Sequence, residues 1–269
     1  MKLIVVFAAI VAGAFSAEDV PLSENGLAAT LAKYGGLTPM RQGRIIGGDA
    51  VSINSFPWTL SLRRLGSHRC GAVIISANRA LSAAHCTDGI DGDGFEVRAG
   101  STQHGSGGQL ISTSDVINHP QFNSETLNND ICVIWLSSSL DLQPVGVSIV
   151  AMHTQGAGVA AGTTVTVAGW GATCEGCDDV ASLRAVSKPV VSNAQCNAFY
   201  GGGITGGMLC AGFPAGGRDA CDGDQGGPLT MGNTLVGIVS WDRLECARPN
   251  RPGIYARVAH YRTWINSNM

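Results

Sequence analysis

The chain has 269 residues, and only 14% of them are Asp, Glu, Lys or Arg, which argues against a disordered or nucleic-acid-binding protein. The formal net charge is -3 and no long run of one sign forms a polybasic patch, so we exclude nucleic acid and a membrane surface as partners. The 37 glycines are about twice the average share of roughly 7%, which indicates many tight turns, because helices tolerate Gly poorly. We therefore expect a β-rich protein that folds as one unit.

The first 16 residues are typical of a secretory signal peptide. A basic residue precedes an apolar run from Leu3 to Phe15, and Ser16 supplies a small residue for cleavage. A transmembrane anchor is the alternative, but the run is shorter than the roughly 20 apolar residues that span a membrane, and Glu18 and Asp19 follow it. We expect a secreted, extracellular protein whose nine cysteines face an oxidising compartment.

Residues 17–44 differ from the rest of the chain. They lack Cys and Trp and end in the basic stretch Arg41-Gln-Gly-Arg44, so we predict a removable pro-segment. After Arg44 apolar residues alternate with polar ones, which predicts half-buried strands. Helical spacing occurs only at the end, from Val258 to Ile265, and predicts a short C-terminal helix.

Several short motifs follow one another after the pro-segment. They are IIGG after Arg44, SAAHC, NNDICVIWL, GWG, DACDGDQGGP, SW and PGIY. In this order they resemble the chymotrypsin and trypsin family of serine proteases, throughout residues 45–269. The resemblance implies an all-β, chymotrypsin-like fold of two six-stranded barrels, divided near residue 150 and followed by the helix, with the active site between the barrels.

The resemblance also assigns catalytic roles. In that family a His takes the proton of a Ser hydroxyl, and a buried Asp orients the imidazole. His85 and Asp130 match these two residues, although His85 alone would pass for an ordinary surface or core histidine. The nucleophile position is residue 225, and the oxyanion hole is placed at Gly223 and Gln225.

Residue 225 is Gln, where the family motif GDSGGP has Ser. A carboxamide nitrogen is no nucleophile, because its lone pair is delocalised into the carbonyl, so no acyl-enzyme can form. We expect the Gln225 amide to fill the oxyanion hole or to contact His85, and to lie within side-chain reach of His85.

The sequence therefore predicts a catalytically inactive serine protease homologue, a pseudoenzyme, that acts as a binding or regulatory protein. The alternative is an active trypsin-like endopeptidase that cleaves after Arg or Lys in digestion or immunity. In that case Gln225 would be a sequencing error or an engineered change, or residual chemistry would be rescued.

A substrate pocket is also implied by the resemblance, with walls and floor at Asp219, Ser240, Trp241, Asp242 and Gly253. Asp219 matches the family members that select Arg or Lys through a charge pair at the pocket floor. A surface Asp in a turn is the alternative for this residue. Asp242 stands where the family has Gly, so we expect it to narrow the entrance, with Glu245 as a second acid at the rim.

The activation site matches the family pattern as well. Cleavage after Arg44 would free the amine of Ile45, which would turn inward and pair with Asp224. The alternative is that IIGG is only the entry to a strand with a Gly turn.

By resemblance, three disulfides are expected: Cys70 with Cys86, Cys196 with Cys210, and Cys221 with Cys246. Cys174 and Cys177 either close a small loop or remain two thiols, since a zinc site would need a second ligand pair that is not nearby. Cys132 is predicted to be a buried free thiol.

We expect no metal and no cofactor. The acidic run from Asp88 to Gly94 resembles part of a calcium loop but does not keep the ligand positions, so a solvated turn is the better interpretation. The partner we expect is a protein or peptide, such as a protease inhibitor or the activating protease, and we expect a monomer.

Overall fold

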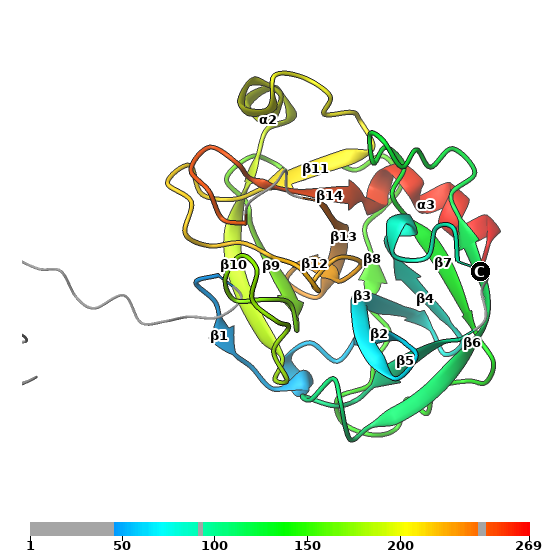
Figure 1. Cartoon of the computed structure of the whole chain (residues 1–269). Coiled ribbons are helices and arrows are strands. Elements are labelled where there is room, and N and C mark those ends of the chain that lie inside the picture. The colour runs from blue at the N-terminus through cyan, green and yellow to red at the C-terminus, as the bar shows by residue number, and fades with distance from the viewer. Residues whose placement is uncertain (1–45, 91–93, 242–245) are drawn as a thin grey trace, which may run out of the picture. The chain divides into compact units, whose positions relative to one another are not determined.

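Short strands dominate the secondary structure and close into two antiparallel barrels of six strands each (Figure 1). The structure is a computed structural model that describes residues 46–90, 94–241 and 246–269. The two barrels and the C-terminal helix form the chymotrypsin fold, so the predicted fold is confirmed.

The first barrel has no free edge, because its strands are hydrogen-bonded in the order β2-β3-β4-β7-β6-β5 and β5 returns to β2. Apolar side chains alternate into its interior: in β5, Phe95, Val97 and Ala99 are buried while the residues between them are partly exposed. The strands are β2 (Thr59–Arg64), β3 (Ser67–Ser76), β4 (Arg79–Ser82), β5 (Phe95–Ala99), β6 (Gln109–Asn118) and β7 (Cys132–Leu136).

The second barrel closes in the order β9-β10-β11-β14-β13-β12, with β12 pairing back to β9. Two short strands extend this sheet: β1 (Asp49–Ala50) pairs with β10, and β8 (Ala151–Met152) runs parallel to β13. The barrel strands are β9 (Thr164–Gly169), β10 (Arg184–Val191), β11 (Met208–Ala211), β12 (Pro228–Met231), β13 (Thr234–Trp241) and β14 (Gly253–Arg257).

The predicted C-terminal helix is present as α3 (Val258–Ser267), which directly follows β14. Its buried residues Val258, Tyr261 and Ile265 are three and four apart, so they share one face, and this face belongs to the core cluster of the first barrel. Trp135 of β7 also donates its indole N–H to the carbonyl of Asn268, at 3.1 Å. The helix thus ties the end of the second barrel to the first.

The sequence predicts one helix, and the structure adds a second, α2 (Asn193–Tyr200). Only Cys196 is buried in it, so it has no apolar stripe for a periodicity argument to find. Its ends do carry signals: Ser192 caps the N-terminus by accepting from the N–H of Gln195, and Gly201 ends the helix with a φ of 70°. Two short 3-10 helices, η1 (Ile53–Ser55) and η2 (Ala84–Cys86), complete the described elements.

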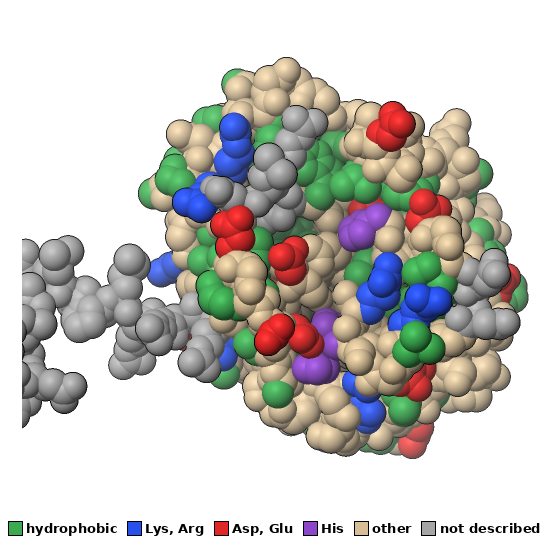
Figure 2. All heavy atoms as spheres, in the orientation of Figure 1, with side chains coloured by type: hydrophobic (Ala, Val, Ile, Leu, Met, Phe, Trp, Pro, Cys, Tyr) green, Lys and Arg blue, Asp and Glu red, His purple; other side chains and the backbone are tan. Residues whose placement is uncertain are grey.

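The surface carries no single dominant charge on the face drawn in Figure 2, where acidic, basic and histidine side chains are interspersed. Among the described residues, no helix has both the length and the apolar character needed to cross a membrane.

Candidate active site

His85 and Asp130 are brought together at the junction of the barrels. His85 lies in η2, and Asp130 lies just before β7. The Asp130 carboxylate accepts from His85 Nδ1 at 2.7 Å and from the backbone N–H of His85 at 2.9 Å. The Asp130 side chain is 1% exposed and that of His85 is 29% exposed, so a buried carboxylate orients an imidazole that solvent can reach.

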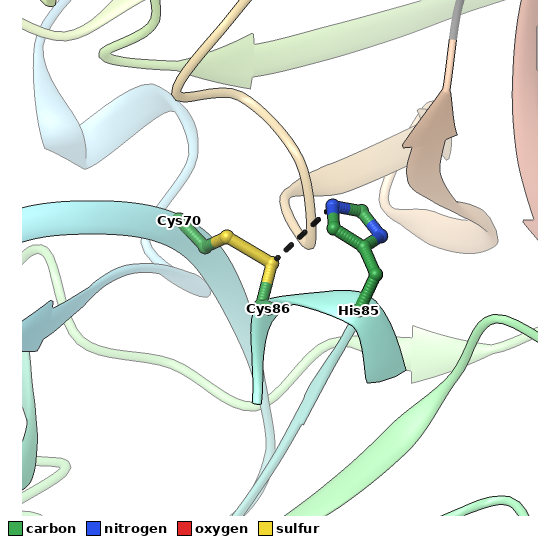
Figure 3. A group of neighbouring side chains, drawn as sticks. All are labelled: Cys70, His85 and Cys86. Carbon is green, nitrogen blue, oxygen red and sulfur yellow. Dashed lines mark hydrogen bonds between the residues drawn. A yellow bond between two sulfur atoms is a disulfide. The ribbon is translucent and has the colours of Figure 1, made fainter. Parts of the chain in front are cut away.

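The second barrel adds a further contact, because Ser240 of β13 donates its hydroxyl to the same carboxylate oxygen that meets His85 Nδ1. With Nδ1–H directed at Asp130, a neutral His85 keeps its free lone pair on Nε2. This Nε2 lies 3.8 Å from Cys86 Sγ (Figure 3). The sulfur is in a disulfide with Cys70 and is therefore not a thiolate, so the cluster of Cys70, His85 and Cys86 does not provide a metal site.

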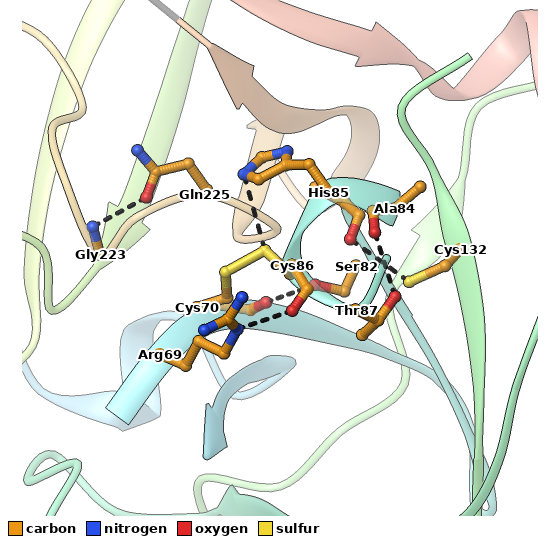
Figure 4. The surroundings of a disulfide bond; sticks show 12 residues. Arg69, Cys70, Ser82, Ala84, His85, Cys86, Thr87, Cys132, Gly223 and Gln225 are labelled. Atoms are coloured by element: carbon orange, nitrogen blue, oxygen red, sulfur yellow. Dashed lines mark hydrogen bonds between the residues drawn. A yellow bond between two sulfur atoms is a disulfide. The ribbon is translucent and has the colours of Figure 1, made fainter. Parts of the chain in front are cut away.

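Gln225 comes from the second barrel, in the loop before β12. Its side-chain oxygen Oε1 accepts a hydrogen bond from the backbone N–H of Gly223 at 2.8 Å. In Figure 4 the carboxamide extends away from the His85 ring toward Gly223. The amide is thus hydrogen-bonded to the backbone of Gly223, one of the two residues at which the resemblance places the oxyanion hole.

The carbonyl of Gly223 is fixed by His68 of β3. His68 Nε2 lies 2.9 Å from Gly223 O, and Nδ1 lies 2.7 Å from Ser61 Oγ. Because a carbonyl only accepts, Nε2 carries the proton and Nδ1 accepts from the Ser61 hydroxyl. Burial lowers the pKa of His68 to about 4, and the bond to Gly223 only partly offsets this. The sequence analysis assigned no role to this neutral histidine, which orients the Gly223 loop.

Asp224 is completely buried beside this loop. Its two carboxylate oxygens accept from the N–H groups of Gly171 at 2.8 Å and of Cys221 at 3.0 Å. Burial raises the pKa of Asp224 to about 6, against the lowering effect of these two bonds. Arg44 and Ile45 lie outside the described residues, so pairing of the Ile45 amine with Asp224 stays a prediction.

Asp219 is 2% exposed, so it is not a residue of a surface turn. Its carboxylate forms an ion pair with Lys188 of β10, whose side chain is completely buried. Burial raises the pKa of Asp219 above its usual value, and Lys188 acts in the opposite direction. Lys188 is a second site residue, besides His68, that the sequence analysis missed, although its position gives a signal. It occupies the same strand face as buried Val186 and Val190, where a strand of this kind would carry apolar side chains.

A small pocket opens next to Gln225. The structure places four of the five expected pocket residues in its lining, namely Asp219, Ser240, Trp241 and Gly253, together with Gln225. Most of the other lining residues are apolar: Ala220, Cys221, Val239, Ile254 and Tyr255. Asp242 and Glu245 lie outside the described residues, so a narrowed entrance stays a prediction.

Four disulfides hold the loops around the site. They are the three pairings that the resemblance implies, Cys70–Cys86, Cys196–Cys210 and Cys221–Cys246, and the local pair Cys174–Cys177. Cys132 is the free cysteine, and its burial raises the pKa of the thiol to about 12. Multiple disulfides fit an oxidising, extracellular compartment.

Comparison with known proteins gives one consistent result. The family model described as Trypsin matches residues 45–265. Trypsin alpha of Drosophila melanogaster is 45% identical over 236 residues, which cover 86% of this chain and 90% of the relative. Trypsin gamma of the same fly is 42% identical over 87% of this chain and 91% of its own length. Trypsin alpha-4 of Lucilia cuprina is 43% identical over 86% of this chain and 90% of its own length. With the family model spanning both barrels and relatives aligned over most of their length, this chain belongs to the trypsin family of serine proteases.

Proposed function

We propose that this trypsin-family protein is secreted and binds a protein or peptide segment in its cleft without cleaving it. One observation carries the proposal: residue 225, at the family's nucleophile position, is a glutamine whose Oε1 accepts from the Gly223 N–H at 2.8 Å. This single side chain removes the nucleophile and also engages a backbone donor of the expected oxyanion hole.

Both effects act on the chemical step. Gln225 has no hydroxyl that His85 could deprotonate, and loss of the serine in a comparable triad costs roughly 10^6 in turnover. The Gly223 N–H would have to stabilise a developing oxyanion, but Gln225 Oε1 already accepts from it. Loss of one such donor typically removes about 2.7 to 4 kcal/mol of transition-state stabilisation.

Binding does not depend on these two groups. The apolar pocket beside Gln225 remains, and the Cys221–Cys246 disulfide connects the loops around it. Such a cleft suits an extended segment of a protein, with an inhibitor or an activating protease as the partner classes. Secretion is supported by the disulfides and by the predicted signal peptide of the first 16 residues.

The second candidate is a trypsin-like endopeptidase. The comparisons by themselves favour it, since the relatives are named trypsins and give no support for inactivity. The contacts among His85, Asp130 and Ser240 also suit a working acid-base pair. Residue 225 decides between the two candidates, because the endopeptidase needs a nucleophile there.

The test uses the full chain, secreted and then cut after Arg44. A mass spectrum of the peptide around residues 221–229 first establishes the side chain at position 225. We then expect no hydrolysis of Arg or Lys esters and amides above background, and no labelling by a serine-directed covalent reagent. Stoichiometric labelling would refute the proposal in favour of the endopeptidase. The Gln225→Ala variant is the matched control, because it also lacks a nucleophile and should be equally inactive.

A further inference from the structure

Lys188 extends from β10 of the second barrel to Asp219, a residue of the pocket lining. It lies on β10 opposite Val165 of β9, and its side chain is completely buried. The ammonium group forms an ion pair with Asp219 and lies 5.1 Å from the centre of the Tyr255 ring. An ammonium over an aromatic face at this distance is attracted to the ring, so Lys188 has two favourable partners within the barrel.

The Asp219 carboxylate is already engaged by partners from its own chain. Its Oδ1 accepts from Lys188 Nζ and, at 2.8 Å, from the N–H of Ala220, and the N–H of Gly253 also donates to this carboxylate. The approach on the Gly253 side is closely packed, since a Cβ added there would lie 2.7 Å from Asp219 Oδ1 and 3.3 Å from Lys188 Nζ. The charge at the pocket floor is therefore balanced before any ligand arrives.

We propose that Lys188 is a specificity-determining residue that neutralises Asp219 from inside the barrel, so that the pocket takes an uncharged, apolar side chain of the bound peptide instead of Arg or Lys. This inference rests on the proposed function only in that the cleft binds a peptide, whether or not the peptide is cleaved.

The physical reason is the balance of charge around two buried side chains, Asp219 and Lys188. A ligand cation would share one carboxylate with the Lys188 ammonium, which leaves one positive charge buried and uncompensated. Asp224 is a second buried carboxylate that interacts with Lys188, and in the cut protein the freed Ile45 amine is expected to balance its charge. An apolar side chain needs no counter-charge and gains from contact with walls such as Val239 and Ile254.

Two small probes of nearly the same shape test the inference on the unaltered protein. Benzamidinium is a flat cation, and benzamide is its neutral counterpart. Binding is followed by NMR shifts of the pocket residues Ala220 and Val239. We expect benzamide to bind at least as tightly as benzamidinium. A preference of about tenfold or more for benzamidinium would overturn the inference, and so would the lack of any shift with benzamide.

Replacing the lysine supplies the second arm. Lys188→Met shortens the side chain by one atom and removes its charge, and we expect it to raise the affinity for benzamidinium by about tenfold or more relative to benzamide. The matched control Lys188→Met with Asp219→Asn has no charge at the floor and should return to the preference of the unaltered protein. An unchanged preference in a folded Lys188→Met protein would refute the role of Lys188.

These outcomes are separate from those of the proposed function. If the protein cleaves peptides, the proposed function fails, and the inference still predicts cleavage after uncharged residues. If the protein cleaves nothing but prefers benzamidinium, the inference fails and the proposed function stands.

Discussion

The clearest pH effect on stability is expected from His68. Its pKa falls from 6.5 to about 4 in the folded protein because burial disfavours the charged ring. Since the folded pKa lies below the unfolded one, the stabilising contribution is complete above pH 6.5 and is lost as the pH falls toward 4. At about 1.4 kcal/mol per pKa unit, the loss approaches roughly 3 kcal/mol, or about 6 to 12 °C in melting temperature for a domain of this size.

The total stability curve does not isolate this effect. Asp224 has a pKa raised to about 6, so its protonation favours the folded state over part of the same pH range, with the opposite sign. His104, Asp179 and Arg63 add smaller effects of mixed sign on His68. We therefore compare the protein with His68→Gln, whose amide can donate to Gly223 and accept from Ser61 but does not titrate.

The measurement is the difference in unfolding free energy between the two proteins, from urea titrations at pH 7.5, 6, 5 and 4. The advantage of the unaltered protein should shrink by roughly 3 kcal/mol toward pH 4, because only His68 becomes protonated. A difference that does not change with pH would show that His68 keeps an ordinary pKa, so that its burial does not disfavour the charged ring.

Three further outcomes are expected. Lys188→Met should lower the unfolding free energy, measured by thermal unfolding, by about 3 to 5 kcal/mol, because it leaves Asp219 buried and unpaired. The double variant Lys188→Met with Asp219→Asn should recover most of this loss. The Cys132 thiol should not react with a thiol reagent in the native protein but should react after the protein is unfolded in urea. Fast labelling of the native protein would contradict the burial of this thiol. Cleavage after Arg44 should increase hydrogen-exchange protection of residues 215–228, an increase that Asp224→Ala should abolish, whereas equal protection before and after cleavage would mean that no switch operates.

The order of the family motifs predicted the two barrels and the contact between His85 and Asp130. The apolar spacing from Val258 to Ile265 predicted the terminal helix. The α2 helix was less accessible, since it buries only Cys196 and shows itself only through its ends at Ser192 and Gly201. Helices of this kind are found by their caps rather than by apolar periodicity.

The hydrogen bonds and ion pairs of the site could not be predicted from the sequence. Gln225 could have bonded to His85 or to Gly223, and only the loop geometry selects Gly223. The pairing of Lys188 with Asp219 joins residues 31 positions apart on different elements, so no local motif contains it. Its one sequence signal is a lysine on the apolar face of β10, which indicates a buried charge without naming its partner.

Gln225 and Lys188 affect different steps, catalysis and selectivity, and this leads to a last prediction about Gln225→Ser. A serine would supply the missing hydroxyl and release the Gly223 N–H, but Lys188 would still neutralise the pocket floor. Gln225→Ser alone should therefore gain activity on substrates with an uncharged residue at the cleavage site and gain little activity on Arg substrates. Asp242, at the expected entrance of the pocket, should limit this gain. Adding Asp242→Gly should raise activity on all substrates, and adding Lys188→Met should shift the preference toward Arg by about tenfold or more in kcat/KM. Full activity on Arg esters from Gln225→Ser alone would contradict the roles given to both Asp242 and Lys188, because a single hydroxyl would then have restored access and selectivity as well as chemistry.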